Sequence, residues 1–163
     1  MLRKIISGGQ QGAEQAALDA ALKNSLKTGG WCNKGKLSGD GAIPMKYELR
    51  EMPFDDPSKK YELNLREATG TIVIFERTEN AFTHQLVELG KKYNKPCLLV
   101  DLHNDFSTEK DVILLWLDAN KIVTLFITGP EENVNGDFYK KSLKLMNSAF
   151  IEKRIEEEDE YND

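Results

Sequence analysis

The stretch that decides the fold is LRKIISGGQQGAEQAALDAAL, residues 2–22. It opens on a short apolar run, Leu2 to Ser7, with two adjacent isoleucines, and two glycines follow directly. Apolar residues then recur at helical spacing from Ala13 to Leu22. This order predicts a strand, a glycine turn and a helix.

The same alternation continues along the chain. The continuous apolar run from Thr71 to Phe75 is typical of a central strand that is buried on both faces. Further strands are predicted at 31–32, 97–101 and 122–128, and further helices at 61–68, 80–93, 107–117 (capped by Ser107 or Thr108) and 138–151. Parallel strands need crossovers of about a dozen residues or more, and these are normally right-handed helices. We therefore predict an α/β fold, a Rossmann-like doubly wound and mainly parallel sheet of about five strands with helices on both faces.

Composition narrows the class of protein. A length of 163 residues suits one domain, and no apolar run approaches the roughly 18 residues that span a bilayer. With no apolar signal-peptide core at the start, we expect a cytoplasmic protein with no membrane partner. Cys32 and Cys97 are then expected to be reduced thiols. His84 and His103 lack the close spacing of zinc ligands, so no metal site is expected.

The net charge of −5 comes from the end of the chain. Residues 152–163 hold seven acids and two bases, which leaves residues 1–151 neutral. We predict one domain over 1–151 and an acidic C-terminal tail over 152–163 that frays into solvent. A neutral body also gives no basic surface for nucleic acid, so no nucleic-acid partner is expected.

In doubly wound sheets, ligands bind outside the carboxyl ends of the strands, so the loops after the strands are the candidate site. The first such loop consists of Ser7, Gly8, Gly9, Gln10, Gln11 and Gly12. Its glycines let the backbone approach a ligand, and the free N–H groups at the start of the next helix favour phosphate. Ala13 and Glu14 replace the lysine and hydroxyl of a P-loop, so a tight turn without a ligand stays open as the alternative.

A second loop combines lysines, glycines and an aromatic ring. It comprises Trp31, Cys32, Asn33, Lys34, Gly35 and Lys36, followed by Gly39, Asp40 and Gly41. These residue types can wrap a phosphate and stack a ring. For Cys32, simple packing at a strand end is the alternative.

Two later loops complete the predicted site. Thr78, Asn80 and Thr83 follow the central strand, where Thr78 or Asn80 is alternatively a helix cap. Gly129, Pro130 and Glu131 follow the last strand. Glu131 is either an acceptor for a base or sugar hydroxyl or a negative residue that stabilises a helix start.

Together these motifs resemble the putative molybdenum carrier family. The resemblance rests on ISGGQ with Gly12, on AALDAA at 16–21, on GGWCNKG at 29–35, on DGAIP at 40–44 and on GPE at 129–131. That family is similar to molybdenum cofactor carrier proteins and, more remotely, to lysine-decarboxylase-like proteins that include nucleotide phosphoribohydrolases. The resemblance implies a Rossmann-like fold, a homo-oligomer and a phosphate-bearing ligand such as a nucleotide or molybdopterin.

This chain departs from the family pattern in two places. Gln11, Glu14 and Gln15 stand where the family usually has Thr, Asp and Arg, which removes a cationic partner for phosphate. Glu79 and Asn80 stand near a position where the family tends to have a Gly-Gly-Thr turn, and a carboxylate there repels an anion.

Three functions follow from these features. The first is a binding protein for a phosphate-bearing molecule, a nucleotide or a molybdenum or pterin cofactor. The second is a hydrolase like the phosphoribohydrolases, whose Gly-Gly-x-Gly-Thr-x-x-Glu arrangement is missing here, so no catalytic residue is assigned. The third is a sensor or scaffold with a degenerate pocket. We expect Gly9→Asp to abolish anion binding and leave the fold intact.

Overall fold

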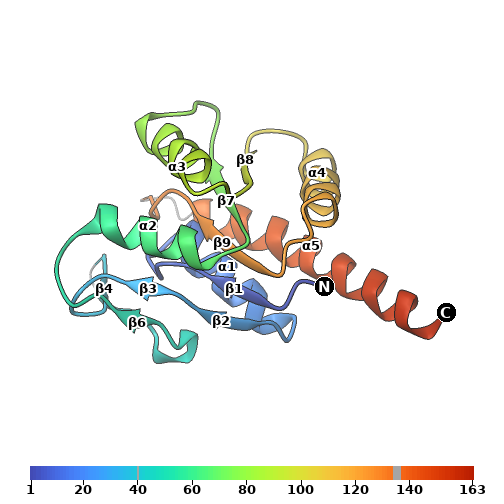
Figure 1. Cartoon of the computed structure of the whole chain (residues 1–163), viewed down its shortest axis with the longest axis horizontal. Coiled ribbons are helices and arrows are strands. Elements are labelled where there is room, and N and C mark those ends of the chain that lie inside the picture. The colour runs from blue at the N-terminus through green and yellow to red at the C-terminus, as the bar shows by residue number, and fades with distance from the viewer. Residues whose placement is uncertain (40, 134–136) are drawn as a thin grey trace.

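The computed structural model describes residues 1–39, 41–133 and 137–163, so Asp40 of the predicted second loop lies outside the described residues (Figure 1). Its centre is a five-stranded sheet in the order β2-β1-β9-β7-β8. The strands are β1 (Lys4–Ile6), β2 (Lys27–Gly29), β7 (Gly70–Phe75), β8 (Cys97–Asp101) and β9 (Thr124–Thr128). Every neighbouring pair is parallel, which confirms the predicted fold class.

Helices cover both faces of this sheet (Figure 1). They are α1 (Ala13–Lys23), α2 (Pro57–Glu67), α3 (Ala81–Lys92), α4 (Phe106–Ala119) and α5 (Asp137–Asn162). Alternate residues of β7 point to opposite faces, so Ile72 packs with apolar residues of α1, α4 and α5, and Val73 packs with those of α2 and α3. Each face of the sheet therefore has its own apolar core.

The second strand of the sheet is not the predicted one. We expected Trp31–Cys32, but Lys27–Gly29 pairs with β1, and Trp31–Cys32 forms β3 of a separate two-stranded sheet with β6 (Arg50–Glu51). Gly30 explains the change of direction, because its φ of 120° turns the chain out of the sheet. The segment between β3 and β6 contains the hairpin of β4 (Leu37–Ser38) and β5 (Gly41–Ala42) and a short 3₁₀ helix, η1 (Met45–Tyr47).

Two helices begin earlier than predicted. Helix α2 begins at Pro57, where the Asp56 side chain accepts a hydrogen bond from the Lys59 backbone. Helix α4 begins at Phe106 and is capped by Asp105 rather than by Ser107 or Thr108. Both caps are aspartates, which satisfy free N–H groups of the first turn as well as a hydroxyl does.

The last helix continues beyond its predicted end at Ile151 into the acidic C-terminal segment. Helix α5 continues to Asn162, and Lys153 forms ion pairs with Asp118 of α4 and with Glu157. Glu157 also accepts a hydrogen bond of 3.1 Å from the backbone of Leu2. Within the described ranges, no helix is long and apolar enough to cross a membrane.

Candidate functional site

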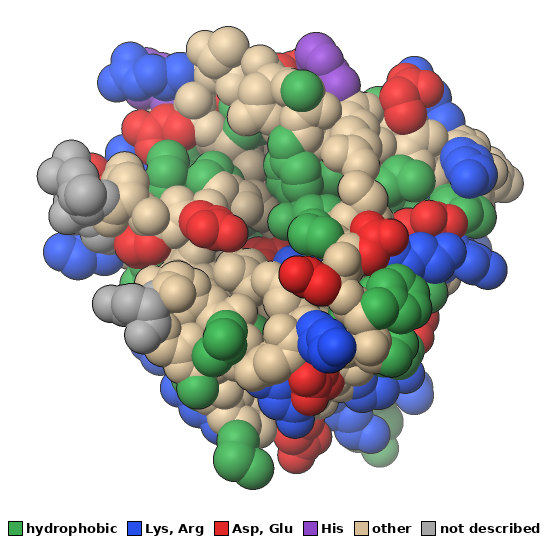
Figure 2. Space-filling model, turned by 90° about the vertical axis from the view of Figure 1, so that its left-hand side faces the viewer, with side chains coloured by type: hydrophobic (Ala, Val, Ile, Leu, Met, Phe, Trp, Pro, Cys, Tyr) green, Lys and Arg blue, Asp and Glu red, His purple; other side chains and the backbone are tan. Residues whose placement is uncertain are grey.

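The candidate site lies where β1, β9 and β7 end. From β1 the chain crosses over to β2, and from β7 it crosses over to β8 on the opposite side, so the strand order reverses around β9. A crevice at such a reversal is the usual ligand site of an open α/β sheet. Figure 2 shows this end of the molecule, where acidic side chains surround a hollow in the middle of the face.

The first and fourth predicted loops lie against each other. Gly12, at φ 103°, approaches the backbone of the loop after β9 so closely that a Cβ atom would lie 2.6 Å from the Pro130 carbonyl oxygen. The same carbonyl accepts a hydrogen bond of 3.2 Å from the Ala13 N–H at the start of α1. Gly12 therefore allows the two loops to approach each other closely. The Ala13 N–H at the start of α1 is bonded to Pro130 and is not available to a ligand.

Glu14 fills the position in which an anion was expected. Its carboxylate accepts hydrogen bonds from the Gln10 N–H at 3.1 Å, from the Gly8 N–H and from the Thr128 hydroxyl at 2.9 Å. The side chain is fully buried, and this burial raises the pKa of the carboxyl group, against the lowering effect of the positive charge of Lys60. The glycine loop thus holds a carboxylate of the protein itself.

The β4–β5 hairpin covers this loop. The Gln11 N–H donates to the Ser38 hydroxyl at 2.7 Å, and the Gln10 side-chain amide donates to the Leu37 carbonyl at 3.2 Å. A Cβ atom at Gly9, where φ is 77°, would lie 2.5 Å from the Leu49 side chain. Gly9→Asp would therefore strain the backbone and press on Leu49, so we expect it to destabilise the fold rather than leave it unchanged.

Trp31 and Cys32 of the second predicted loop have partners away from the glycine loop. The Trp31 indole N–H donates to Glu67 at 3.0 Å, and the Arg50 guanidinium lies 4.2 Å from the ring centroid. Cys32 is fully buried beside Ile43, and burial raises the pKa of its thiol, as the packing alternative implies. The remaining described residues of this loop follow β3 or belong to the hairpin and its approach: Asn33, Lys34, Gly35, Lys36, Gly39 and Gly41.

The third loop forms a helix cap. The Asn80 side chain accepts from the Thr83 N–H at 3.1 Å, and the Thr83 hydroxyl accepts from the Asn80 N–H at 2.9 Å. This capping box begins α3 and confirms the capping alternative for Asn80. Thr78 lies in a tight turn, where its N–H donates to the Glu76 carbonyl at 2.9 Å.

Sequence reasoning missed Lys60 on α2. Its side chain is 1 % exposed, and its ammonium lies 4.8 Å from the centroid of the Tyr61 ring. Among the described residues, no hydrogen bond or ion pair holds this ammonium. Lys60 and Asn64 are four residues apart on the buried face of the helix, a spacing that is visible in the sequence but does not show which charged residue points inward.

A pocket of about 250 Å³ adjoins Tyr61 at the ends of β7 and β9. Its lining brings together residues of the third and fourth predicted loops with residues of α2 and β7: Tyr61, Ile74, Phe75, Asn80, Phe82, Thr83, Gly129, Pro130 and Glu131. Burial raises the pKa of Tyr61, and the charges of Glu14 and Glu131 add to this shift, so the phenol stays neutral.

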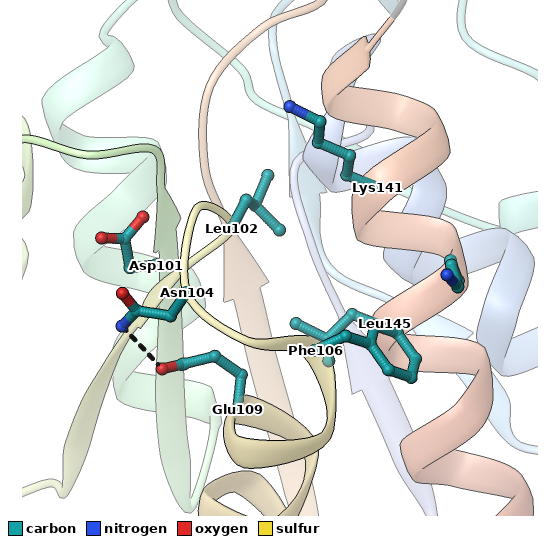
Figure 3. A pocket seen from close by; sticks show the side chains of 8 residues that line it. Asp101, Leu102, Asn104, Phe106, Glu109, Lys141 and Leu145 are labelled. Carbon is teal, nitrogen blue, oxygen red and sulfur yellow. Dashed lines mark hydrogen bonds between the residues drawn. The ribbon is translucent and has the colours of Figure 1, made fainter.

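A second pocket, of about 190 Å³, lies beside β8 between α4 and α5 (Figure 3). Its charged groups already have partners. Glu109 accepts from the Asn104 amide at 2.9 Å, the hydrogen bond drawn in Figure 3, and Lys141 forms an ion pair of 3.0 Å with Glu76. Lys144 lies over the Phe106 ring. We therefore take as the candidate site the pocket at the ends of β7 and β9, which Tyr61 lines next to Lys60.

This fold and pocket define a Rossmann-like α/β protein with its candidate site at the carboxyl edge of the sheet. The chain belongs to the circularly permutated YpsA SLOG family, cpYpsA, whose model matches residues 5–150. It is also similar to a crystal structure, at 1.45 Å resolution, of the putative molybdenum carrier protein from Syntrophus aciditrophicus SB. The two chains share 35% identity with a TM-score of 0.84, and the match covers 91% of this chain and 94% of the other. The resemblance drawn from the sequence is thereby confirmed, and no curated protein matches.

Proposed function

We propose that this protein is a binding protein for a small phosphate-bearing molecule, a nucleotide or a molybdenum or pterin cofactor. The anionic group would lie beside Lys60, next to the pocket that Tyr61 lines. The name of the Syntrophus relative agrees with a carrier role.

The ammonium of Lys60, on a side chain that is 1 % exposed and makes no hydrogen bond or ion pair with the described residues, is the observation that carries this proposal. A buried charge without a hydrogen-bond partner is costly, so buried lysines are normally paired. Lys60 has a neighbouring ring and a more distant carboxylate, Glu14, but no hydrogen bond among the described residues. An anionic ligand would supply the missing partner.

The proposal moves the anion from the place that the sequence indicated. Glu14 already accepts the N–H groups of Gly8 and Gln10, so the glycine loop itself has little left to offer a phosphate. A second negative charge in that loop would also be repelled by the carboxylate. The phosphate is therefore expected against α2 rather than inside the loop.

Calorimetry with the purified protein tests this. The ligands are ribose 5-phosphate, AMP, GMP and molybdate, each titrated into wild type and Lys60→Met. The matched control is Lys59→Met, because Lys59 is the adjacent lysine, is 38% exposed at its side chain and pairs with Glu62. A charge-assisted hydrogen bond is worth about 1.5–3 kcal/mol, so Lys60→Met should weaken the ligand that binds by about 10- to 150-fold.

Thermal unfolding of the three proteins shows whether each variant is folded. We expect Lys60→Met to stay folded, because methionine fills a similar volume without a buried charge. Equal affinity of wild type and Lys60→Met for the compound that binds would contradict the proposal, and so would no binding to wild type of any of these compounds or of neopterin phosphate, added to the panel as the pterin.

A further inference from the structure

The pocket beside Tyr61 has the walls of a site for a planar ring. The Tyr61 and Phe82 rings meet edge to face, with centroids 4.9 Å apart and an interplanar angle of 66°. Phe75 adds a third aromatic side chain to the lining. Aromatic surfaces of this kind stack well against heteroaromatic rings. At about 250 Å³ the pocket is smaller than the roughly 300–1,000 Å³ of sites that hold a whole drug-sized ligand, so it suits one part of a ligand.

Glu131 is the charged group of this pocket, and the residue is exposed to solvent. The side chains of Asn80 and Thr83 are committed to the capping box of α3. Among the described residues, by contrast, no hydrogen bond or ion pair holds the Glu131 carboxylate. An ionised carboxylate only accepts hydrogen bonds, and its two oxygens can accept from two adjacent donors at once.

This chemistry selects one edge of a heteroaromatic ring. A 2-amino-4-oxopyrimidine edge, as in guanine and in pterins, presents a ring N–H next to an exocyclic amino group. Adenine presents an amino group next to a ring nitrogen that has a lone pair, which a carboxylate repels. Hypoxanthine keeps the ring N–H and lacks the amino group.

We infer that the pocket lined by Tyr61, Phe82 and Glu131 binds a ring with a 2-amino-4-oxopyrimidine edge, and that Glu131 accepts its two N–H donors. The inference builds on the proposed function, because the anionic part of the same ligand would reach Lys60. The two subsites are adjacent, since Tyr61 lines the pocket and its ring also contacts the Lys60 ammonium.

The ranking of ligands tests the ring subsite. Calorimetry should give the tightest binding for GMP, weaker binding for IMP and the weakest for AMP. A bidentate contact of this kind discriminates between bases by about 5- to 150-fold, so the GMP to AMP ratio should fall in this range. Glu131→Gln should remove the ranking, and Glu79→Gln, which makes the same change of charge in the neighbouring loop at a side chain that is 47% exposed, should keep it.

Three further ligands distinguish this inference from the proposed function. Guanosine and adenosine carry no phosphate, so a preference for guanosine that depends on Glu131 reports on the ring subsite alone. Neopterin has the same edge on a different ring, and its affinity relative to guanosine distinguishes a pterin ligand from a nucleotide.

Each result has a definite reading. Equal binding of GMP and AMP that still depends on Lys60 would overturn the ring subsite and leave the proposed function standing. Binding of guanosine that depends on Glu131, with no effect of Lys60→Met on the affinity for GMP, would support the ring subsite and overturn the proposed function. Absence of binding by every compound would overturn both.

Discussion

Replacing Glu14 by alanine tests whether the protein supplies the anion of its own glycine loop. The substitution leaves the buried N–H groups of Gly8 and Gln10 without their acceptor, and each unsatisfied group costs about 1–3 kcal/mol. Removal of a buried charge offsets part of this sum, so we expect a net loss of about 2–4 kcal/mol in the free energy of unfolding. This is a large share of the roughly 5–15 kcal/mol that holds a domain together.

Equilibrium unfolding in urea measures this loss. Glu88→Ala is the matched control, because its carboxylate is 70% exposed and pairs with the equally exposed Lys91, so its loss should stay below about 0.5 kcal/mol. Glu14→Gln keeps an acceptor oxygen for the loop, and the Thr128 hydroxyl can accept from the new amide. Its loss in the free energy of unfolding should therefore lie between those of Glu14→Ala and Glu88→Ala. If Glu14→Ala is as stable as the control, the carboxylate does not organise the loop, and the N–H groups of Gly8 and Gln10 do not depend on it as an acceptor.

Two more predictions concern single groups. Because burial raises the pKa of Glu14, its folded form binds a proton more tightly than the unfolded chain, whose carboxyl titrates near pH 4.3. The stability of wild type relative to Glu14→Gln should therefore be greatest below that pH and should decrease as the pH rises through the folded pKa. Urea unfolding between pH 4 and 8 measures this trend. An increase in relative stability with pH would contradict the prediction. Asn80→Ala removes one half of the capping box of α3 and should cost about 1 kcal/mol in the same assay at neutral pH, whereas a change near zero would mean that the cap is not formed in solution.

The strands that the sequence predicted well are those that consist of continuous apolar runs. Gly70–Phe75 is buried along its whole length, because helices cover the sheet above and below it. Cys97–Asp101 lies at one edge of the sheet and is only partly buried, but four of its five residues are apolar. The strand at Lys27–Gly29 was missed because it has three residues, lies at the edge of the sheet and begins with an exposed lysine. Its place depends on pairing with β1, which no local pattern reveals.

The loops that line the candidate site were predicted to follow strand ends, but the contacts among their side chains were not predicted. Strand ends followed by glycine or proline correctly marked the carboxyl edge, since this depends on local sequence. The role of Glu14 depends on hydrogen bonds with Thr128, which lies 114 residues away, and the burial of Lys60 depends on how α2 packs. Both are products of tertiary structure, so a helical period alone could not distinguish them from surface charges.

The position of β9 has a consequence for how the chain acquires its fold. This strand lies between β1 and β7, so Lys4 pairs with Thr124 and the two halves of the sheet do not touch until residues 124–128 have been added. During synthesis, a chain that ends before β9 would expose one open edge of β1 and one of β7, and open edges promote association with other chains. Contacts between such distant residues also slow folding. The last strand thus joins the two halves of the sheet. We expect that truncated chains lacking it aggregate instead of folding as a smaller domain.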